Sequence, residues 1–326
     1  MDYILNFADI VLSNCGGAME MLSKIKSKIF HTEAGMCIAY FLRNAKPRMK
    51  ILSAEKTIAY IEQHHCSVAR FGDGEFEMLL GDVSESGTGV SGFQKQNPEL
   101  SKRLAEVLAS KDPNLLVCIP YTLNSIWGRT QESRNFWYYW SERNEQRKRI
   151  TDLIHNFHGI DKVFGDSQVS RPYIAWETKK KADGIFPSLM GLWANKDIII
   201  VEGVKTRMGV GNDLFAGARS IKRILGPAKN AFDYIDEILE KIEEFHTNEL
   251  IIMALGPTAT ILAAELSAKG IQAVDIGHID IEYEWYLRGA KKPELIPGKF
   301  TNEAAQSSDV DACNDEWYNS QIVAYI

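Results

Sequence analysis

Several features that would mark a secreted or membrane protein are missing from this 326-residue sequence. Its five cysteines form no Cys-x-x-Cys pair and are odd in number, so we expect a reducing compartment, the cytoplasm, and not a disulfide framework. No stretch approaches the roughly 18 uninterrupted apolar residues of a spanning helix, and no basic region precedes an apolar segment near residue 1. We therefore expect neither secretion nor a membrane span, while peripheral association with the inner face of a membrane stays open.

An excess of positive charge is also absent. The formal net charge is −6 and the isoelectric point is near 5.7, which argues against nucleic acid as the partner. A single anionic ligand suits this balance better than a polyanion does. The hydrophobic content of 45% and charged content of 25% are ordinary for a globular protein with one large core or two modest ones.

The composition changes twice along the chain. Residues 1–50 are expected to form a helical extension, in which the apolar spacing over 19–29 favours a packing helix over a membrane-surface helix. Residues 51–292 form the predicted main domain. Residues 293–326 are richer in Pro, Asn, Asp and Ser and are expected to pack on that domain or to be loosely ordered.

From residue 52 onward, short β-branched runs alternate with helical stretches, which predicts an α/β fold with a mostly parallel sheet and helices on both faces. The predicted strands are 67–71, 115–119, 162–164, 197–201, 220–225, 250–255 and 273–276. The clearest predicted helices are 98–110, 231–245 and 259–269, the last of which ends at Gly270.

Acidic, basic and glycine residues follow the predicted strands, at the edge where ligands bind in open parallel sheets. Asp73-Gly74-Glu75 follows strand 67–71, and two carboxylates on one turn suit Mg²⁺ or Mn²⁺, which would neutralise a diphosphate. A solvated Asp-Gly turn is the alternative. Arg70 lies within the apolar strand and needs a carboxylate or phosphate partner, which favours the functional interpretation.

Two further clusters offer groups to an anion. The loop from Glu202 to Asp213 combines glycines with Lys205 and Arg207, and backbone N–H groups near Gly209 and Gly211 could hold phosphate oxygens. A purely structural glycine-rich loop is the alternative. The segment Gly256-Pro257-Thr258 opens a predicted helix, where free N–H groups and a hydroxyl attract anions.

The segment 278–284 alternates polar and apolar residues. An extended backbone would place His278, Asp280, Glu282 and Glu284 on one face, where they could supply a metal ligand and a carboxylate base. An edge strand with a wet side is the alternative. The aromatic residues at 127 and 137–140 could stack on sugar rings, although a division between core and interface is favoured.

Four motifs in this order resemble the GT-D-fold glycosyltransferases over about residues 52–290: 70–75, 170–173, 201–215 and 275–285. The resemblance implies a Rossmann-like fold, so residues 51–292 would be a GT-D-like catalytic domain. It also implies a divalent metal, a UDP-sugar donor of the UDP-glucose type, and a glycan or glycoprotein acceptor. Asp73 and Glu75 would form the metal and diphosphate site. The residues assigned to the nucleotide-sugar site are Arg70, Gly72, Gly74, Ser170, Arg171, Glu202, Lys205, Arg207, Gly209, Gly211, Asn212, Asp213, Gly256, Pro257 and Thr258.

The same resemblance implies that 278–284 is the active-site strand. There we expect Glu284 to deprotonate the acceptor hydroxyl, with Glu282 as second candidate and His278 beside them, as a metal-bound diphosphate leaves. Base action on the acceptor implies inversion at the anomeric carbon. A metal-dependent phosphohydrolase or nucleotidyltransferase uses similar groups, and a non-catalytic nucleotide-binding subunit of a polysaccharide assembly complex is a further alternative.

Overall fold

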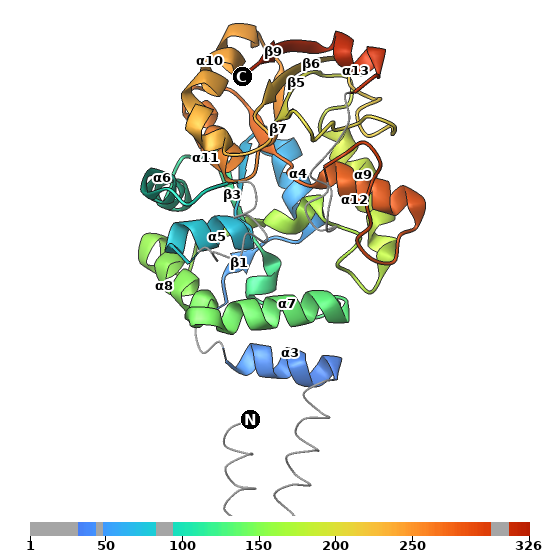
Figure 1. The fold of residues 1–326 in the computed structure, drawn as a ribbon. Coiled ribbons are helices and arrows are strands. Elements are labelled where there is room, and N and C mark those ends of the chain that lie inside the picture. Colours follow the sequence, from blue (N-terminus) through green and yellow to red (C-terminus); the bar gives the residue numbers. More distant parts are fainter. Residues whose placement is uncertain (1–31, 44–47, 83–93, 301–312) are drawn as a thin grey trace, which may run out of the picture. The chain divides into compact units, whose positions relative to one another are not determined.

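The computed structural model describes residues 32–43, 48–82, 94–300 and 313–326, which belong to two compact units (Figure 1). The smaller unit is Met1–Met49, Tyr121–Asp161 and Ala175–Glu177, and the larger unit is Lys50–Pro120, Lys162–Ile174 and Thr178–Ile326. No helix among the described residues is long and apolar enough to cross a membrane. The predicted helix over 19–29 lies outside the described residues.

The larger unit is built on a parallel sheet that has nine strands within the described ranges. Its strand order is β1-β4-β3-β2-β8-β7-β5-β6-β9, and every neighbouring pair is parallel. This confirms the predicted fold class, and each of the seven predicted strands is present. The strands are β1 (Lys50–Ile51), β2 (Ser67–Arg70), β3 (Leu115–Ile119), β4 (Val163–Asp166), β5 (Asp197–Gly203), β6 (Ser220–Gly226), β7 (Leu250–Ala254), β8 (Ala273–Asp275) and β9 (Ile322–Tyr325).

Helices cover both faces of this sheet. Figure 1 shows α6, α10 and α11 on one side of the strands and α4 and α9 on the other. The central strands β3, β5 and β7 are therefore buried almost throughout, as their continuous apolar runs predict. The helices of this unit are α4 (Ala54–His64), α5 (Asp73–Leu80), α6 (Pro98–Leu108), α9 (Ala182–Gly191), α10 (Ile235–Phe245), α11 (Pro257–Ala268), α12 (Ile279–Arg288) and α13 (Glu316–Ser320).

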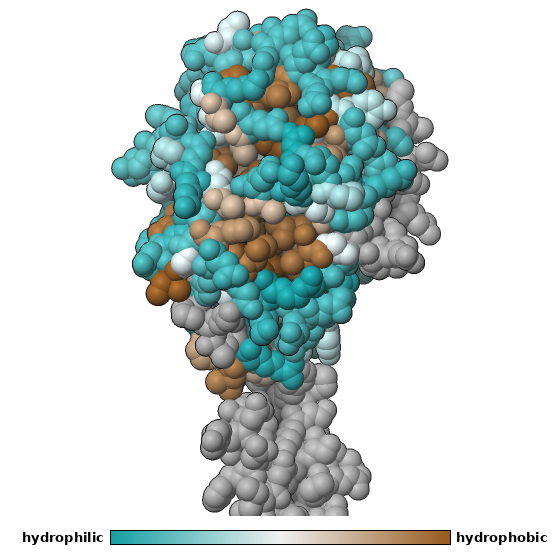
Figure 2. Space-filling view, turned by 90° about the vertical axis from the view of Figure 1, so that its left-hand side faces the viewer, coloured by the Kyte–Doolittle hydropathy of each residue, from teal (hydrophilic) through white to brown (hydrophobic). Residues whose placement is uncertain are grey.

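Local sequence signals set the ends and faces of these helices. Asn97 caps α6, because its side chain accepts the Glu99 N–H at 2.8 Å, and Pro98 occupies the first turn. In α10, Ile235, Ile238 and Ile242 are buried, and the remaining positions are mostly acidic. Figure 2 views the molecule from the α6, α10 and α11 side, and hydrophilic side chains cover much of that surface.

The smaller unit is helical where it is described, with α3 (Glu33–Leu42), α7 (Gln131–Glu142) and α8 (Gln146–His158). Tyr40 is buried and donates to the Thr122 carbonyl at 2.7 Å, while Arg147 lies 3.7 Å from the Tyr40 ring centroid. Of the aromatic residues singled out in the sequence, Trp137, Tyr138 and Trp140 are buried, as the predicted core part requires, whereas Trp127 and Tyr139 are exposed.

Candidate functional site

The polar clusters gather at the carboxyl edge of the sheet. The central strands β2, β8, β7 and β5 are neighbours and run parallel, so the residues that follow them meet at one edge. One contact fixes the arrangement at its centre: Thr260, in the first turn of α11, donates its hydroxyl to the Arg70 carbonyl at 2.8 Å. The start of α11, which follows β7, therefore lies against the end of β2. Asp73 follows that end of β2 by three residues.

Arg70 is satisfied by protein groups. Its Nε donates to the Asp275 carbonyl at 2.9 Å and its Nη2 to the Asp275 carboxylate at 3.0 Å. Its Nη1 donates at 2.9 Å both to the Ser167 carbonyl and to the Ser170 hydroxyl. The predicted need for an acidic partner is thus met by Asp275, on the neighbouring strand β8. Arg70 and Ser170 therefore have a structural role at the ends of the strands. The positive charge of Arg70 is balanced by Asp275 and needs no phosphate.

Gly277 makes room for this arginine. A Cβ at that position would lie 1.9 Å from Arg70 Nη2, and the φ of +44° suits glycine. Burial raises the pKa of the Asp275 carboxyl, and the Arg70 guanidinium opposes that rise. The tight packing of Gly277, Arg70 and Asp275 therefore holds the ends of β2 and β8 together.

Asp73-Gly74-Glu75 forms the first turn of α5 directly after β2. Glu75 closes this turn, because its Oε2 accepts the Gly72 N–H at 2.8 Å. Burial raises the pKa of Glu75 to about 7, and the nearby Asp275 and Asp73 add to the rise. Asp73 is partly exposed, and Gly74 is buried.

This donor set fits a metal ion that is shared with a substrate. Mg²⁺-type ions commonly take one or two protein carboxylates and fill their other positions with phosphate oxygens and water. Asp73 and Glu75 provide two oxygen-bearing groups in the first turn of α5. Residues two apart on a helix point in different directions, so the partly exposed Asp73 is the better placed ligand, while Glu75 accepts the Gly72 N–H. Within the described ranges, no three His, Cys, Asp or Glu residues form a complete protein-only metal site.

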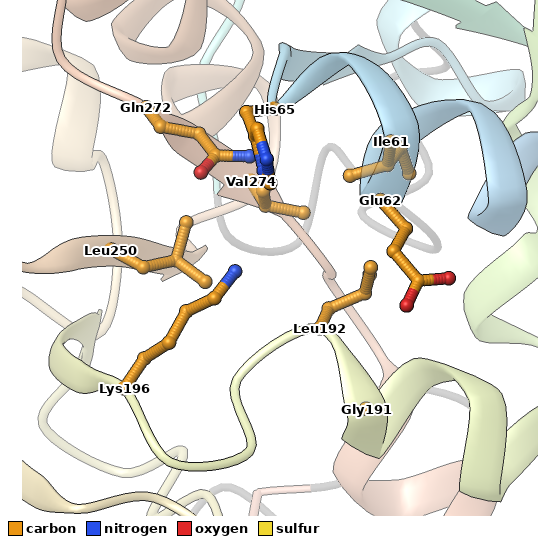
Figure 3. A pocket seen from close by; sticks show the side chains of 9 residues that line it. All are labelled: Ile61, Glu62, His65, Gly191, Leu192, Lys196, Leu250, Gln272 and Val274. Carbon is orange, nitrogen blue, oxygen red and sulfur yellow. The ribbon is translucent and has the colours of Figure 1, made fainter.

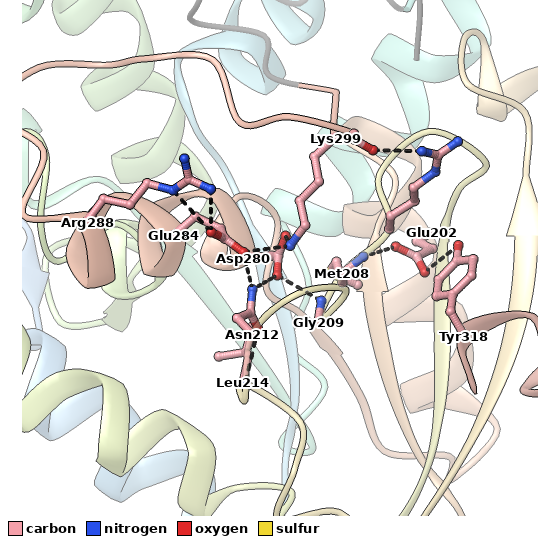
Figure 4. Close-up of polar contacts among 12 residues, drawn as sticks. Glu202, Met208, Gly209, Asn212, Leu214, Asp280, Glu284, Arg288, Lys299 and Tyr318 are labelled. Atoms are coloured by element: carbon pink, nitrogen blue, oxygen red, sulfur yellow. Dashed lines mark hydrogen bonds and ion pairs between the residues drawn. The ribbon is translucent and has the colours of Figure 1, made fainter. Parts of the chain in front are cut away.

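The glycine-rich loop after β5 differs from the predicted phosphate cradle. The Met208 N–H donates to the Glu202 carboxylate at 2.7 Å, and the Gly209 N–H donates to Asp280 Oδ1 at 2.8 Å (Figure 4). Protein carboxylates thus bind N–H groups that the sequence assigned to phosphate. Lys205 and Asn212 are partly exposed and Gly211 and Asp213 are exposed, but the Asn212 amide donates inward to Asp280 at 2.9 Å and to Glu284 at 2.8 Å.

Behind this loop lies a buried ion pair. Glu202 and Arg223 are both fully buried, with Glu202 Oε1 2.6 Å from Arg223 Nη1. Tyr318 donates its hydroxyl to the same carboxylate at 3.3 Å, and Gln321 accepts from Arg223 at 2.7 Å. Glu202 therefore joins the loop to β6 and to the C-terminal segment, which is a structural role.

The predicted strand over 278–284 is wrong, because these residues begin α12. In a helix, residues four apart share a face, so Asp280 and Glu284 point together while Glu282 points elsewhere. Gly277, with its positive φ, ends the extended segment, and the following residues are buried on every side. The polar and apolar residues alternate in the sequence, but both kinds are buried in the helix, so the alternation does not mark a strand.

The two predicted acidic bases are deeply bound. Glu282 is fully buried, accepts the Tyr173 and Ile174 N–H groups at 3.1 and 3.0 Å, and lies 3.6 Å from Arg171. Glu284 accepts from Asn212 at 2.8 Å and from Lys299 at 3.1 Å, and it pairs with Arg288 at 3.3 Å. His278, by contrast, is partly exposed at the start of α12.

The turn after β7 contains a buried hydroxyl group that is not hydrogen-bonded to the described protein. Gly256 has a φ of +55°, and Pro257 starts α11 in its first turn, as predicted. The Thr258 hydroxyl is fully buried and makes no hydrogen bond among the described residues. Pro257 has no N–H and the Ala259 N–H donates to the Gly256 carbonyl at 2.9 Å, so the Thr258 hydroxyl is the group of this turn that is suited to an anionic oxygen.

A cavity lies at the opposite edge of the sheet, where the strands begin. It has a volume of about 160 Å³ and is formed where β7 and β8 begin, with Lys196 and His65 near Leu250 and Val274 (Figure 3). None of the predicted site residues lines it. The cavity is therefore separate from the carboxyl-edge site.

Three residues that form buried ion pairs near the site were not assigned a role from the sequence. Asp275 lies in the motif 275–285 but had no predicted role. Arg223 lies in the predicted strand 220–225, where its charge alone gave no indication of a partner. Lys299 lies in the segment 293–326, to which the sequence assigned no site residue. Their pairing depends on contacts between distant segments, which a local pattern does not contain.

Comparison with known proteins agrees with this arrangement. A family model described as "Glycosyltransferase GT-D fold" matches residues 68–304. The probable glycosyl transferase Gly of Streptococcus gordonii is 37% identical over 278 residues, 85% of this chain and 39% of that protein. Glycosyltransferase GlyD of Streptococcus pneumoniae serotype 4 (strain ATCC BAA-334 / TIGR4) is 37% identical over 279 residues, 85% of this chain and 33% of that protein. The chain thus spans less than half the length of these relatives.

Solved structures show the same architecture. One is described as "The highly conserved domain of unknown function 1792 has a distinct glycosyltransferase fold"; it is 38% identical, with a TM-score of 0.78, over 90% of this chain and 100% of that one. A second, "A New Glycosyltransferase (DUF1792) from Streptococcus sanguinis", is 38% identical with a TM-score of 0.75, over 86% of this chain and 100% of that one. The chain belongs to the GT-D-fold glycosyltransferase family.

Proposed function

We propose that this protein is a metal-dependent glycosyltransferase that moves a glucose-type hexose from a UDP-sugar to a hydroxyl of a glycan or glycoprotein acceptor. One observation carries the proposal: the carboxylates of α5's first turn follow β2, whose end is bound by Thr260 in the first turn of α11. This contact supports a site in which a helix start that could bind an anion lies beside carboxylates that could hold a metal, the combination that suits a diphosphate.

The residues divide into donor-binding and acid–base roles. Asp73 and Glu75 would hold Mn²⁺ or Mg²⁺, which stabilises the departing diphosphate. The unbonded Thr258 hydroxyl at the start of α11 would bind a phosphate oxygen. A base must reach the acceptor hydroxyl, so we propose His278, partly exposed, ahead of the buried Glu284.

The central test is transfer from UDP-glucose to a panel of glycans with Mn²⁺, comparing wild type with Asp73→Asn. Loss of the carboxylate should abolish metal-stimulated transfer. Glu99→Gln is the matched control, since Glu99 also lies in a first helix turn but is exposed on α6. Free sugar or phosphate release without any transfer would favour the phosphohydrolase alternative. Donor binding without turnover would favour a non-catalytic subunit.

The base is tested separately. His278→Gln should lower kcat about 10²- to 10⁴-fold with donor binding retained, because general-base catalysis contributes about that much. An unchanged kcat would exclude His278, and Glu284→Gln would then be the next variant.

We also propose that the protein acts in the cytoplasm, with peripheral contact at the inner face of a membrane as an option. Cys37, Cys66, Cys118 and Cys313 are free thiols, which supports a reducing compartment. Labelling of intact and lysed cells with an impermeant thiol reagent would test this location.

A further inference from the structure

A segment after α12 is hydrogen-bonded both to α12 and to the first residues of the glycine-rich loop. In residues 290–300, the Glu294 carbonyl accepts from Trp285 of α12 at 2.9 Å. The Gly298 carbonyl accepts from Arg207 at 2.8 Å, and the Phe300 N–H donates to the Lys205 carbonyl at 3.0 Å. This segment therefore lies against the loop and carries Lys299 with it.

Lys299 is the only buried lysine among the described residues, with a side chain only 3% exposed. Its Nζ lies 2.7 Å from Asp280 Oδ2 and 3.1 Å from Glu284 Oε1 (Figure 4). Both carboxylates are also nearly buried, and in a helix they lie on the same face. Arg288 also pairs with Glu284 at 3.3 Å, but Lys299 contacts both carboxylates, and its removal would leave Asp280 without this cation beside a second acid in a site of low dielectric constant.

The other oxygens of this acid pair hold the loop. Asp280 accepts the Gly209 N–H at 2.8 Å, and Asn212 donates to Asp280 at 2.9 Å and to Glu284 at 2.8 Å. The order of contacts is therefore Lys299, then the acid pair, then the loop. A change at Lys299 therefore reaches the loop through the carboxylates of Asp280 and Glu284.

We propose that Lys299 is a positioning residue that sets the conformation of the loop 204–213 for the donor nucleotide-sugar. The inference rests on the proposed function for its ligand, while its structural part concerns the loop alone. Lys299 touches no reacting atom. It acts by compensating Asp280 and Glu284, so that their oxygens remain fixed acceptors for Gly209 and Asn212.

The test compares Lys299→Met with Lys292→Met, which removes an exposed lysine from the same segment. In protein without donor, hydrogen exchange of 204–213 should rise about tenfold or more in Lys299→Met and stay unchanged in the control, because local opening becomes easier. The KM for UDP-sugar should rise by a similar factor, about tenfold, while kcat changes less than about threefold.

A second variant keeps the test informative if Lys299→Met is unstable. Lys299→Met with Asp280→Asn removes one negative charge together with the positive one, and it should restore loop protection to within about threefold of wild type. Unchanged exchange in Lys299→Met, or a folded double variant with no recovery, would overturn the proposal. Hydrogen exchange is measured without donor. Absence of transferase activity would therefore count against the proposed function, whereas the exchange data would still test the role of Lys299 in the loop.

Discussion

Substitution of the two glycines that flank α12 would measure how much the Arg70–Asp275 contact contributes to the free energy of unfolding. Gly277 precedes the helix with a φ of +44°, and Gly289 ends it with a φ of +64°. Alanine at either position meets the left-handed backbone penalty of about 1–2 kcal/mol. At Gly289 a Cβ would contact nothing within 4 Å, whereas at Gly277 it would lie 1.9 Å from Arg70 Nη2.

The clash should dominate the effect at Gly277. Arg70 cannot yield without breaking bonds to Asp275, whose side chain is only 4% exposed. Removing the partner of a buried charge costs about 3–5 kcal/mol. We therefore expect Gly277→Ala to lower the free energy of unfolding by about 5 kcal/mol and Gly289→Ala by about 1–2 kcal/mol.

Urea unfolding followed by tryptophan fluorescence measures this difference through the midpoints of the two variants. Adding Asp275→Asn to Gly277→Ala provides the control, since a neutral amide tolerates the displaced arginine better and should recover part of the loss. Equal midpoint shifts for the two glycine variants would refute the reasoning, because they would show that Arg70 moves aside freely.

Three further predictions follow from other contacts. Hydrogen bonds from Lys222 and two backbone N–H groups outweigh burial and lower the pKa of Glu249 to about 2, from 4.5. Glu249→Gln should therefore lose about 3 kcal/mol at pH 7, a difference that shrinks below pH 4.5 in urea titrations. Arg223→Met strands the fully buried Glu202 and should cost about 3–5 kcal/mol by the same assay, with recovery when Glu202→Leu is added. Thr258→Val should leave the melting temperature unchanged but raise the donor KM about fivefold; an unchanged KM would remove Thr258 from the donor site.

The sequence was most informative where burial is continuous. Runs such as 198–201 are apolar at every position, so the central strands were predictable without long-range knowledge. The edge strands β1 and β9 were missed because β1 has only two residues and β9 lies in a polar tail. Their pairing is decided by tertiary contacts and not by local composition.

The site was predictable in position but not in its internal pairings. The turns after β2, β5, β7 and β8 were found because glycine and charge follow apolar strands. The interpretation of 278–284 as a strand failed since a helix buried on all sides has no clear 3.6-residue pattern. Lys299 was not assigned because its meaning depends on Asp280 and Glu284, which become neighbours only in the fold.

The place of β8 in the sheet has a consequence for how this protein is made. Ser67 of β2 and Ala273 of β8 are bonded across 206 residues, and β8 stands between β2 and β7. During synthesis, β2 and β3 can pair early, but they cannot join the strands beyond β8 until residue 275 has left the ribosome. We expect slow folding with a partly formed sheet that exposes apolar strand edges, and therefore a dependence of yield on chaperones and on translation rate.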